Sequence, residues 1–163
     1  MNLSEKLTRG ELDRHYLEMA IMESVSSDDP KRVLFPRSAV GVIIADRSGV
    51  LAASANVVPP GLADKLHLES RDLAEPERYY FIEHAERGAI YKALLHGKVL
   101  GAATIYGTRF PCADCARAIV WCGIRRAVFS SGLSGEEHWL ESQRAALQMM
   151  RLSGVKVRVS LGG

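Results

Sequence analysis

The spacing of apolar positions along the chain predicts four helices, and each has a boundary signal. The predicted helices run from the Thr8–Glu11 capping-box pattern to about Val25, over 83–96, from Pro111 to Cys122, and over 136–151. A polar cluster ends the first helix, and a glycine follows each of the other three as an expected C-terminal cap. The helix over 83–96 is apolar around much of its circumference, which predicts that it is buried.

Runs of apolar and β-branched residues between these helices predict five strands. They cover 39–45, 50–55, 102–106, 126–130 and 155–160. The first two flank the turn Asp46-Arg47-Ser48-Gly49 and are typical of a β-hairpin with glycine at the position that needs positive φ. A hairpin followed by alternating helices and strands predicts an α/β protein with a mixed sheet and helices on both faces.

The segment 56–80 interrupts this pattern because it has no sustained periodicity and contains several prolines. A loop of this length in a compact domain is usually functional, so we expect it to form a wall or lid of the active site. The alternative is a short helix around Leu66 that the periodicity does not reveal.

Composition narrows the class of protein. The 163 residues, 47% hydrophobic and 25% charged, fit a single domain over 1–163. The net charge of +2 implies no strong field for a polyanion, so nucleic acid is not an expected partner. The chain shows no bilayer-length apolar run and no signal-peptide pattern, so we expect a cytoplasmic protein without membrane contact. Three cysteines do not suggest a disulfide framework.

Two short motifs at predicted helix starts carry candidate chemistry: His84-Ala85-Glu86 and Pro111-Cys112-Ala113-Asp114-Cys115. Ligands in such sheets sit at the carboxyl ends of strands, where the following helices begin, so we expect the motifs to meet. Cys112 and Cys115 share one helix face, and a helix N-terminus favours the thiolate form that binds metal.

One C-x-x-C pair cannot complete a zinc site, so a histidine or carboxylate must add a ligand. His84 is the best candidate, and the remaining cysteine, Cys122, is better explained as a buried apolar residue. Three protein ligands with an open fourth position are typical of a catalytic zinc. Glu86 could then accept a proton from water at the open position.

A C-x-x-C pair on its own also fits a redox dithiol or half of a zinc ribbon. A ribbon requires a second C-x-x-C, which the sequence lacks. The combined pattern H-x-E…P-C-x-x-C is instead the signature of zinc deaminases.

With these motifs the sequence resembles the cytidine/deoxycytidylate deaminase superfamily, most closely its dCMP deaminase branch. The resemblance covers about 39–131 and includes Asn56-Val57-Val58-Pro59-Pro60-Gly61 and Tyr106-Gly107-Thr108-Arg109-Phe110-Pro111-Cys112. It implies a three-layer cytidine-deaminase-like fold with a central five-stranded sheet, and a homo-oligomer. It also implies zinc-dependent hydrolysis of dCMP to dUMP with release of ammonia, and one zinc per chain.

Carried over by position, the resemblance assigns His84, Cys112 and Cys115 to zinc and Glu86 to proton transfer. It implies that Asn56 contacts the sugar or base and that the Ala85 backbone contacts the base. Candidates for binding a 5′-phosphate are Arg71, Arg78, Arg87 and Arg109. One position departs from the branch: many dCMP deaminases have asparagine where this chain has Gly88, so we expect a changed contact or packing arrangement near the pocket.

Two alternatives remain open. The first is a tRNA adenosine, guanine or other nucleoside or base deaminase of the same superfamily. A tRNA enzyme should bind its polyanion with steep salt dependence, and the modest net charge favours a small nucleotide. The second is a non-catalytic zinc protein that uses the fold for association, against which Glu86 argues because a structural site needs no proton carrier.

Overall fold

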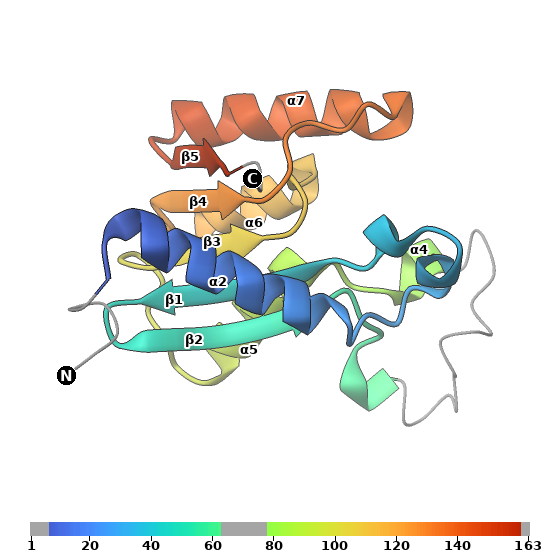
Figure 1. Cartoon of the computed structure of the whole chain (residues 1–163), viewed down its shortest axis with the longest axis horizontal. Coiled ribbons are helices and arrows are strands. Elements are labelled where there is room, and N and C mark those ends of the chain that lie inside the picture. Colours follow the sequence, from blue (N-terminus) through green and yellow to red (C-terminus); the bar gives the residue numbers. More distant parts are fainter. Residues whose placement is uncertain (1–6, 63–77, 161–163) are drawn as a thin grey trace.

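A five-stranded mixed sheet forms the centre of the protein (Figure 1). The computed structural model describes residues 7–62 and 78–160. The strands are β1 Gly41–Asp46, β2 Gly49–Ala55, β3 Thr104–Gly107, β4 Arg126–Phe129 and β5 Lys156–Val159, in the spatial order β2-β1-β3-β4-β5. β1 pairs antiparallel with β2 and β3, whereas β3–β4 and β4–β5 are parallel. The predicted mixed sheet is confirmed.

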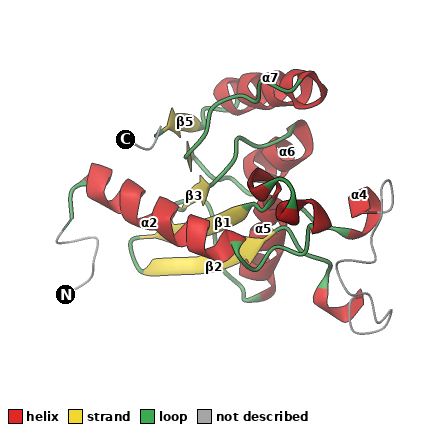
Figure 2. Ribbon diagram, turned by 45° about the vertical axis from the view of Figure 1, so that its right-hand side comes forward, coloured by secondary structure: helices red, strands yellow, loops and turns green. Residues whose placement is uncertain are grey.

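Helices cover both faces of the sheet, as predicted (Figure 2). The elements outside the sheet are α2 Arg9–Ser24, the 3₁₀ turns η1 Pro30–Val33 and η2 Pro36–Ser38, α4 Arg78–Phe81, α5 Ala85–Leu95, α6 Ala113–Trp121 and α7 Glu137–Leu152. α2 lies on one face, α5 and α6 pack on the other, and α7 lies against α6 and β5. Among the described helices, none has both the length and the apolar character needed to cross a membrane.

Alternation along the strands divides the core into two layers. Val42 and Ile44 of β1 point into the larger cluster with α5 and α6, whereas Ile43 points into the smaller cluster under α2. Tyr16 and Leu17 are among the α2 residues that close the smaller cluster. Burial of both faces explains why β1 is apolar at almost every position.

Most predicted boundaries agree with the structure. Thr8 and Glu11 form the expected capping box, with the Thr8 N–H donating to Glu11 Oε2 at 2.8 Å. Gly49 turns the hairpin at a φ of 121°. In the segment 56–80, residues 63–77, including the alternative helix at Leu66 and Arg71, lie outside the described residues.

Two expectations were wrong. Pro111 does not open a helix: α6 starts at Ala113 because Cys112 has an extended backbone (φ −76°, ψ 172°) and is the N-cap. The helix over 83–96 is not buried all round. Its alanine-rich side packs on the sheet, but Leu94 and Leu95 are 51% and 84% exposed because no described element covers its outer side.

Candidate functional site

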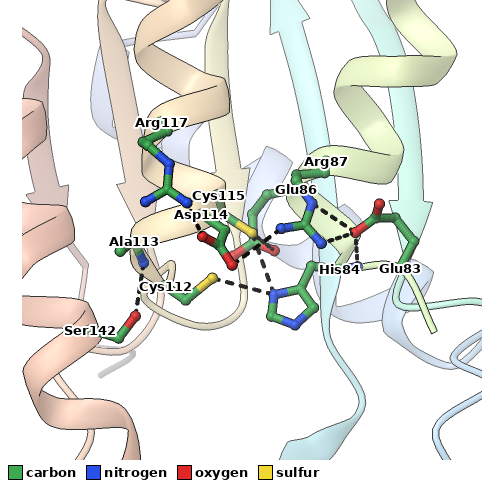
Figure 3. A network of polar contacts seen from close by, with 10 residues as sticks. All are labelled: Glu83, His84, Glu86, Arg87, Cys112, Ala113, Asp114, Cys115, Arg117 and Ser142. Carbon is green, nitrogen blue, oxygen red and sulfur yellow. Dashed lines mark hydrogen bonds and ion pairs between the residues drawn. The ribbon is translucent and has the colours of Figure 1, made fainter. Parts of the chain in front are cut away.

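The two sequence motifs meet where α5 and α6 begin side by side (Figure 3). His84 is the N-cap of α5, Cys112 is the N-cap of α6, and Cys115 lies in the first turn of α6. α6 follows the parallel strand β3, so its N-terminus lies at the carboxyl end of that strand. The expectation that the topology would bring the motifs together is confirmed.

The three candidate ligands have the separations that a tetrahedral zinc requires. His84 Nδ1 lies 3.5 Å from Cys112 Sγ and 3.4 Å from Cys115 Sγ, and all ligand atoms lie within 4.8 Å of one another. Zinc bonds of about 2.3 Å to sulfur and about 2.0 Å to nitrogen place these atoms about 3.5 Å apart in a tetrahedron. The donor set and its spacing therefore fit one zinc ion.

The thiol groups of the two cysteines have opposite pKa shifts. The hydrogen bond from the Cys115 thiol, followed by the His84 contact, lowers the pKa of Cys112 to about 4 against the effect of burial. That same hydrogen bond and burial raise the pKa of Cys115 well above its usual range. The contact with Cys112 raises the pKa of His84. A bound metal would displace the retained proton, since cysteine binds zinc as thiolate.

Glu86 lies in the first turn of α5, beside the candidate ligands. Glu86 is 4% exposed, and its Oε2 lies 3.5 Å from Cys115 Sγ. Burial raises the pKa of Glu86, which makes the carboxylate a better proton acceptor. Such a shift suits a residue that exchanges protons near neutral pH.

A cavity of about 610 Å³ opens beside these residues. It contacts all but one of the predicted site residues: Asn56, His84, Ala85, Glu86, Arg109 and Cys112. Cys115 is not in the wall, because it is fully buried. The η1–η2 segment and the first turns of α7 supply most of the remaining wall.

Asn56 lines the cavity, but its amide is also bonded to the backbone. Asn56 Oδ1 accepts from the Val40 N–H at 2.8 Å, and Nδ2 donates to the Ser38 carbonyl at 3.0 Å. The side chain thus fixes the chain just after η2. It retains one amide hydrogen and one oxygen lone pair.

Arg109 lies beside Trp139, a residue that the sequence did not mark as functional. Its guanidinium carbon is 6.0 Å from the centre of the indole ring, and its Nη1 donates to the Arg37 carbonyl at 3.4 Å. The Trp139 ring is edge-on to the ring of His84, with 6.2 Å between centroids. Trp139 matched the apolar spacing of a core helix, so its pattern gave no sign of a place in the wall.

The arginines considered as candidates for binding a 5′-phosphate differ in their position relative to the cavity. Arg87 bonds Glu83 and lies 3.8 Å from Asp114, and it does not line the cavity (Figure 3). The side chains of Arg71 and Arg78 lie outside the described part of the chain. Sequence reasoning missed Lys31 and Arg37, which do line the cavity. They follow a polar turn that has no signature of a site, so only the fold could reveal them.

Gly88 marks a close contact between α5 and β2. A Cβ at this position would lie 2.7 Å from Ser54 Oγ, and Ser54 is fully buried. Gly88 does not line the cavity. The glycine that this chain has in place of asparagine therefore allows close packing between the first turn of α5 and β2.

Comparison with known proteins adds an independent finding. A family model described as "Cytidine and deoxycytidylate deaminase zinc-binding region" matches residues 11–131, which include both motifs. The chain is 28% identical over 152 residues to the deoxycytidylate deaminase of Mus musculus, covering 91% of this chain and 79% of that protein. It is 27% identical over 125 residues to a probable deoxycytidylate deaminase of Caenorhabditis elegans, covering 75% of this chain and 59% of that protein.

The fold also has a solved counterpart. The crystal structure of a dCMP deaminase from the cyanophage S-TIM5 superposes with a TM-score of 0.69 at 19% identity. The match covers 94% of this chain and all of the phage chain. At this identity the likeness establishes the three-layer fold.

Proposed function

Because the chain belongs to the cytidine and deoxycytidylate deaminase zinc-binding family, we propose that it hydrolyses dCMP to dUMP and ammonia with one zinc per chain. The observation that carries the proposal is the grouping of His84, Cys112 and Cys115 with the buried carboxylate of Glu86 at one cavity. A purely structural zinc site would be closed by four protein ligands and would need no proton carrier.

The chain's own residues divide the chemistry. Zinc held at this site would lower the pKa of a water molecule, so that hydroxide would be available near neutral pH. Glu86 accepts the proton of the attacking water and delivers it to the ring nitrogen of the base. It then takes a second proton from the hydroxyl newly attached to the ring carbon and transfers it to the amino group. The C–N bond breaks, so that water and the cytosine ring yield uracil and ammonia.

Residues of the wall would hold the base against this carboxylate. Ala85 and Trp139 both line the cavity, and the Trp139 ring lies edge-on to His84. Asn56 can add a contact to sugar or base through its remaining amide hydrogen. Fixed placement of the base near the attacking water lowers the entropic part of the barrier.

An anionic substrate suits two arginines that line the same cavity. Arg37 and Arg109 both line the cavity and are joined through the Arg37 carbonyl. Neither forms an ion pair with a carboxylate among residues 7–62 and 78–160. Arginine binds phosphate oxygens through paired N–H groups, so this pair supports a nucleotide over a free base.

We also propose that the protein forms a homo-oligomer and is located in the cytoplasm. Trp121 at the end of α6 is 92% exposed, and Leu95 and Val99, at and just after the end of α5, are each 84% exposed, which supports burial of these side chains in a homo-oligomer. Two cysteine ligands must stay reduced to bind zinc, which supports a cytoplasmic location.

A substrate panel tests the reaction. Zinc-loaded protein is incubated with dCMP, CMP, deoxycytidine, cytosine, guanine and adenosine, and ammonia release is followed. We expect dCMP to give the highest kcat/KM, with a lower value for deoxycytidine because it lacks the phosphate. Preferred release from guanine or adenosine would overturn the substrate, and no release from any compound would favour the non-catalytic alternative.

A further inference from the structure

Two consecutive residues of α7 bond the backbone on either side of the candidate ligand Cys112. The Ser142 hydroxyl accepts a hydrogen bond of 3.0 Å from the Ala113 N–H (Figure 3). The Gln143 side-chain amide donates to the Phe110 carbonyl at 2.9 Å. The segment that presents Cys112 is therefore tied at both ends to a helix that contributes no candidate ligand.

Gln143 is buried and uses both ends of its amide. Its side chain is 3% exposed, and its Oε1 accepts a hydrogen bond of 2.6 Å from the Ser134 N–H. A buried amide with both ends paired has one favoured orientation. A flipped amide would place its NH₂ group against a backbone N–H and its oxygen against a backbone carbonyl oxygen. Gln143 thus joins the loop after β4 to the segment before α6.

Cys112 needs such outside support more than Cys115 does. Cys115 lies inside α6, whereas Cys112 is the N-cap, where the chain has not yet become helical. Pro111 has no N–H to donate, and the N–H of Ala113 has no partner within the helix. The contacts from α7 hold the two peptide groups on either side of this stretch.

We propose that Gln143 and Ser142 are positioning residues of the metal centre, which fix Cys112 at the distance from His84 and Cys115 that one zinc requires. The proposal rests on the proposed metal site and not on the identity of the substrate. Metal–ligand distances tolerate deviations of only about 0.2 Å, so a loosened segment weakens the site before it unfolds the protein. Outer partners that orient metal ligands contribute about 10- to 100-fold to metal affinity.

Three variants separate this role from simple packing. Gln143→Glu keeps the acceptor for Ser134 but replaces the donor to Phe110 with an oxygen. Ser142→Ala removes the acceptor for the Ala113 N–H. Gln148→Glu is the matched control, because it makes the same change on an exposed position of α7.

The measurement is the rate at which each zinc-loaded full-length protein releases zinc to a chromogenic chelator, at a temperature where circular dichroism shows every variant folded. We expect release about tenfold faster or more for Gln143→Glu, a smaller acceleration for Ser142→Ala, and the wild-type rate for Gln148→Glu. In active protein, kcat of Ser142→Ala should fall more than its KM changes, because Ser142 does not line the cavity.

Wild-type release rates in both Gln143→Glu and Ser142→Ala would overturn the proposal, even if their melting temperatures fall. If Gln143→Glu does not fold, Ser142→Ala decides alone, because its side chain is only partly buried. A wild-type protein that holds no zinc would overturn the metal site and the positioning role together. If the protein holds zinc but deaminates nothing, release rates still decide the positioning role and only the proposed reaction fails.

Discussion

At the scale of single residues, the proposed proton transfer depends on the environment of Glu86. Its carboxylate is buried at the start of α5, next to two thiols and an imidazole. Burial raises its pKa, while the neighbouring His84 lowers it to a lesser degree. A carboxylate in this setting can both accept and return a proton, which the proposed hydrolysis requires.

Glu86→Gln tests this role because it keeps shape and removes the exchangeable proton. We expect kcat for dCMP to fall about 100- to 10,000-fold, the range that general acid–base catalysis contributes. Zinc content, measured by atomic emission, should stay at the wild-type level because Glu86 is not a ligand. Activity within twofold of wild type would remove Glu86 from the mechanism.

The sequence predicted the chemistry of the ligands better than it predicted the cavity. Spacing alone grouped Cys112 with Cys115, and helix placement added His84. Lys31, Arg37 and the orientation of Trp139 could not be predicted, because they reach the cavity through contacts between elements far apart in the chain. Local patterns carry no record of such contacts.

At the scale of elements, close approach between α5 and β2 sets where the first motif lies. The absence of a side chain at Gly88 allows the helix to pack against the buried Ser54. Periodicity located both elements, since burial of one face governs apolar spacing in helices and strands alike. Periodicity could not locate the exact start of α6, because Pro111 is compatible with both the N1 position and the residue before the cap.

A double-mutant cycle measures this contact. Gly88→Ala should destabilise the protein by about 1–2 kcal/mol, because the new methyl would meet Ser54 Oγ at 2.7 Å. In a Ser54→Ala background the same change should be neutral or stabilising by up to about 1 kcal/mol, since alanine favours a helix over glycine. Urea unfolding gives the four free energies, and additive effects would contradict the proposed contact.

The other face of the sheet is secured by a buried carboxylate. Asp13 of α2 accepts two hydrogen bonds from Arg126 of β4, at 2.8 and 2.6 Å, and one from Arg158 of β5 at 3.1 Å. Its side chain is 2% exposed, whereas that of Arg158 is 52% exposed. The Arg126 pair is thus the more strongly desolvated of the two.

Asp13→Ala should lower the free energy of unfolding by about 3 kcal/mol, because it leaves Arg126 without a partner in a largely buried place. Arg158→Ala is the control for an exposed arm of the same cluster and should cost less than about 1 kcal/mol. If both variants lose the same free energy of unfolding in urea, burial of the Asp13–Arg126 pair does not determine how much that pair stabilises the protein.

At the scale of the whole molecule, three large apolar side chains are exposed at or just after the C-terminal ends of α5 and α6. Trp121, Leu95 and Val99 lie far from the motifs, which occupy the opposite ends of the two helices. Together they could form the interface of the homo-oligomer that we propose. A homo-oligomer formed there would leave the N-terminal ends of both helices free to form the site.

Light scattering after size exclusion should therefore give a mass that is a multiple of 17.9 kDa for the wild type. Trp121→Glu should shift the protein towards the single-chain mass, because burying a charge in an apolar contact is costly. Met22→Glu, at a 73% exposed position of α2 on the other face of the sheet, is the matched control and should leave the mass unchanged. A wild type of single-chain mass at micromolar concentration would contradict assembly.

Zinc-dependent deamination at a single site per chain is tested most directly by a zinc titration. Metal-free protein is titrated with zinc while conversion of dCMP to dUMP is followed. We predict no conversion without zinc, a linear rise, and a plateau at one zinc per chain. Three results would contradict this mechanism: a rate of conversion that does not depend on zinc, a plateau at a different number of zinc ions per chain, or zinc binding without formation of dUMP.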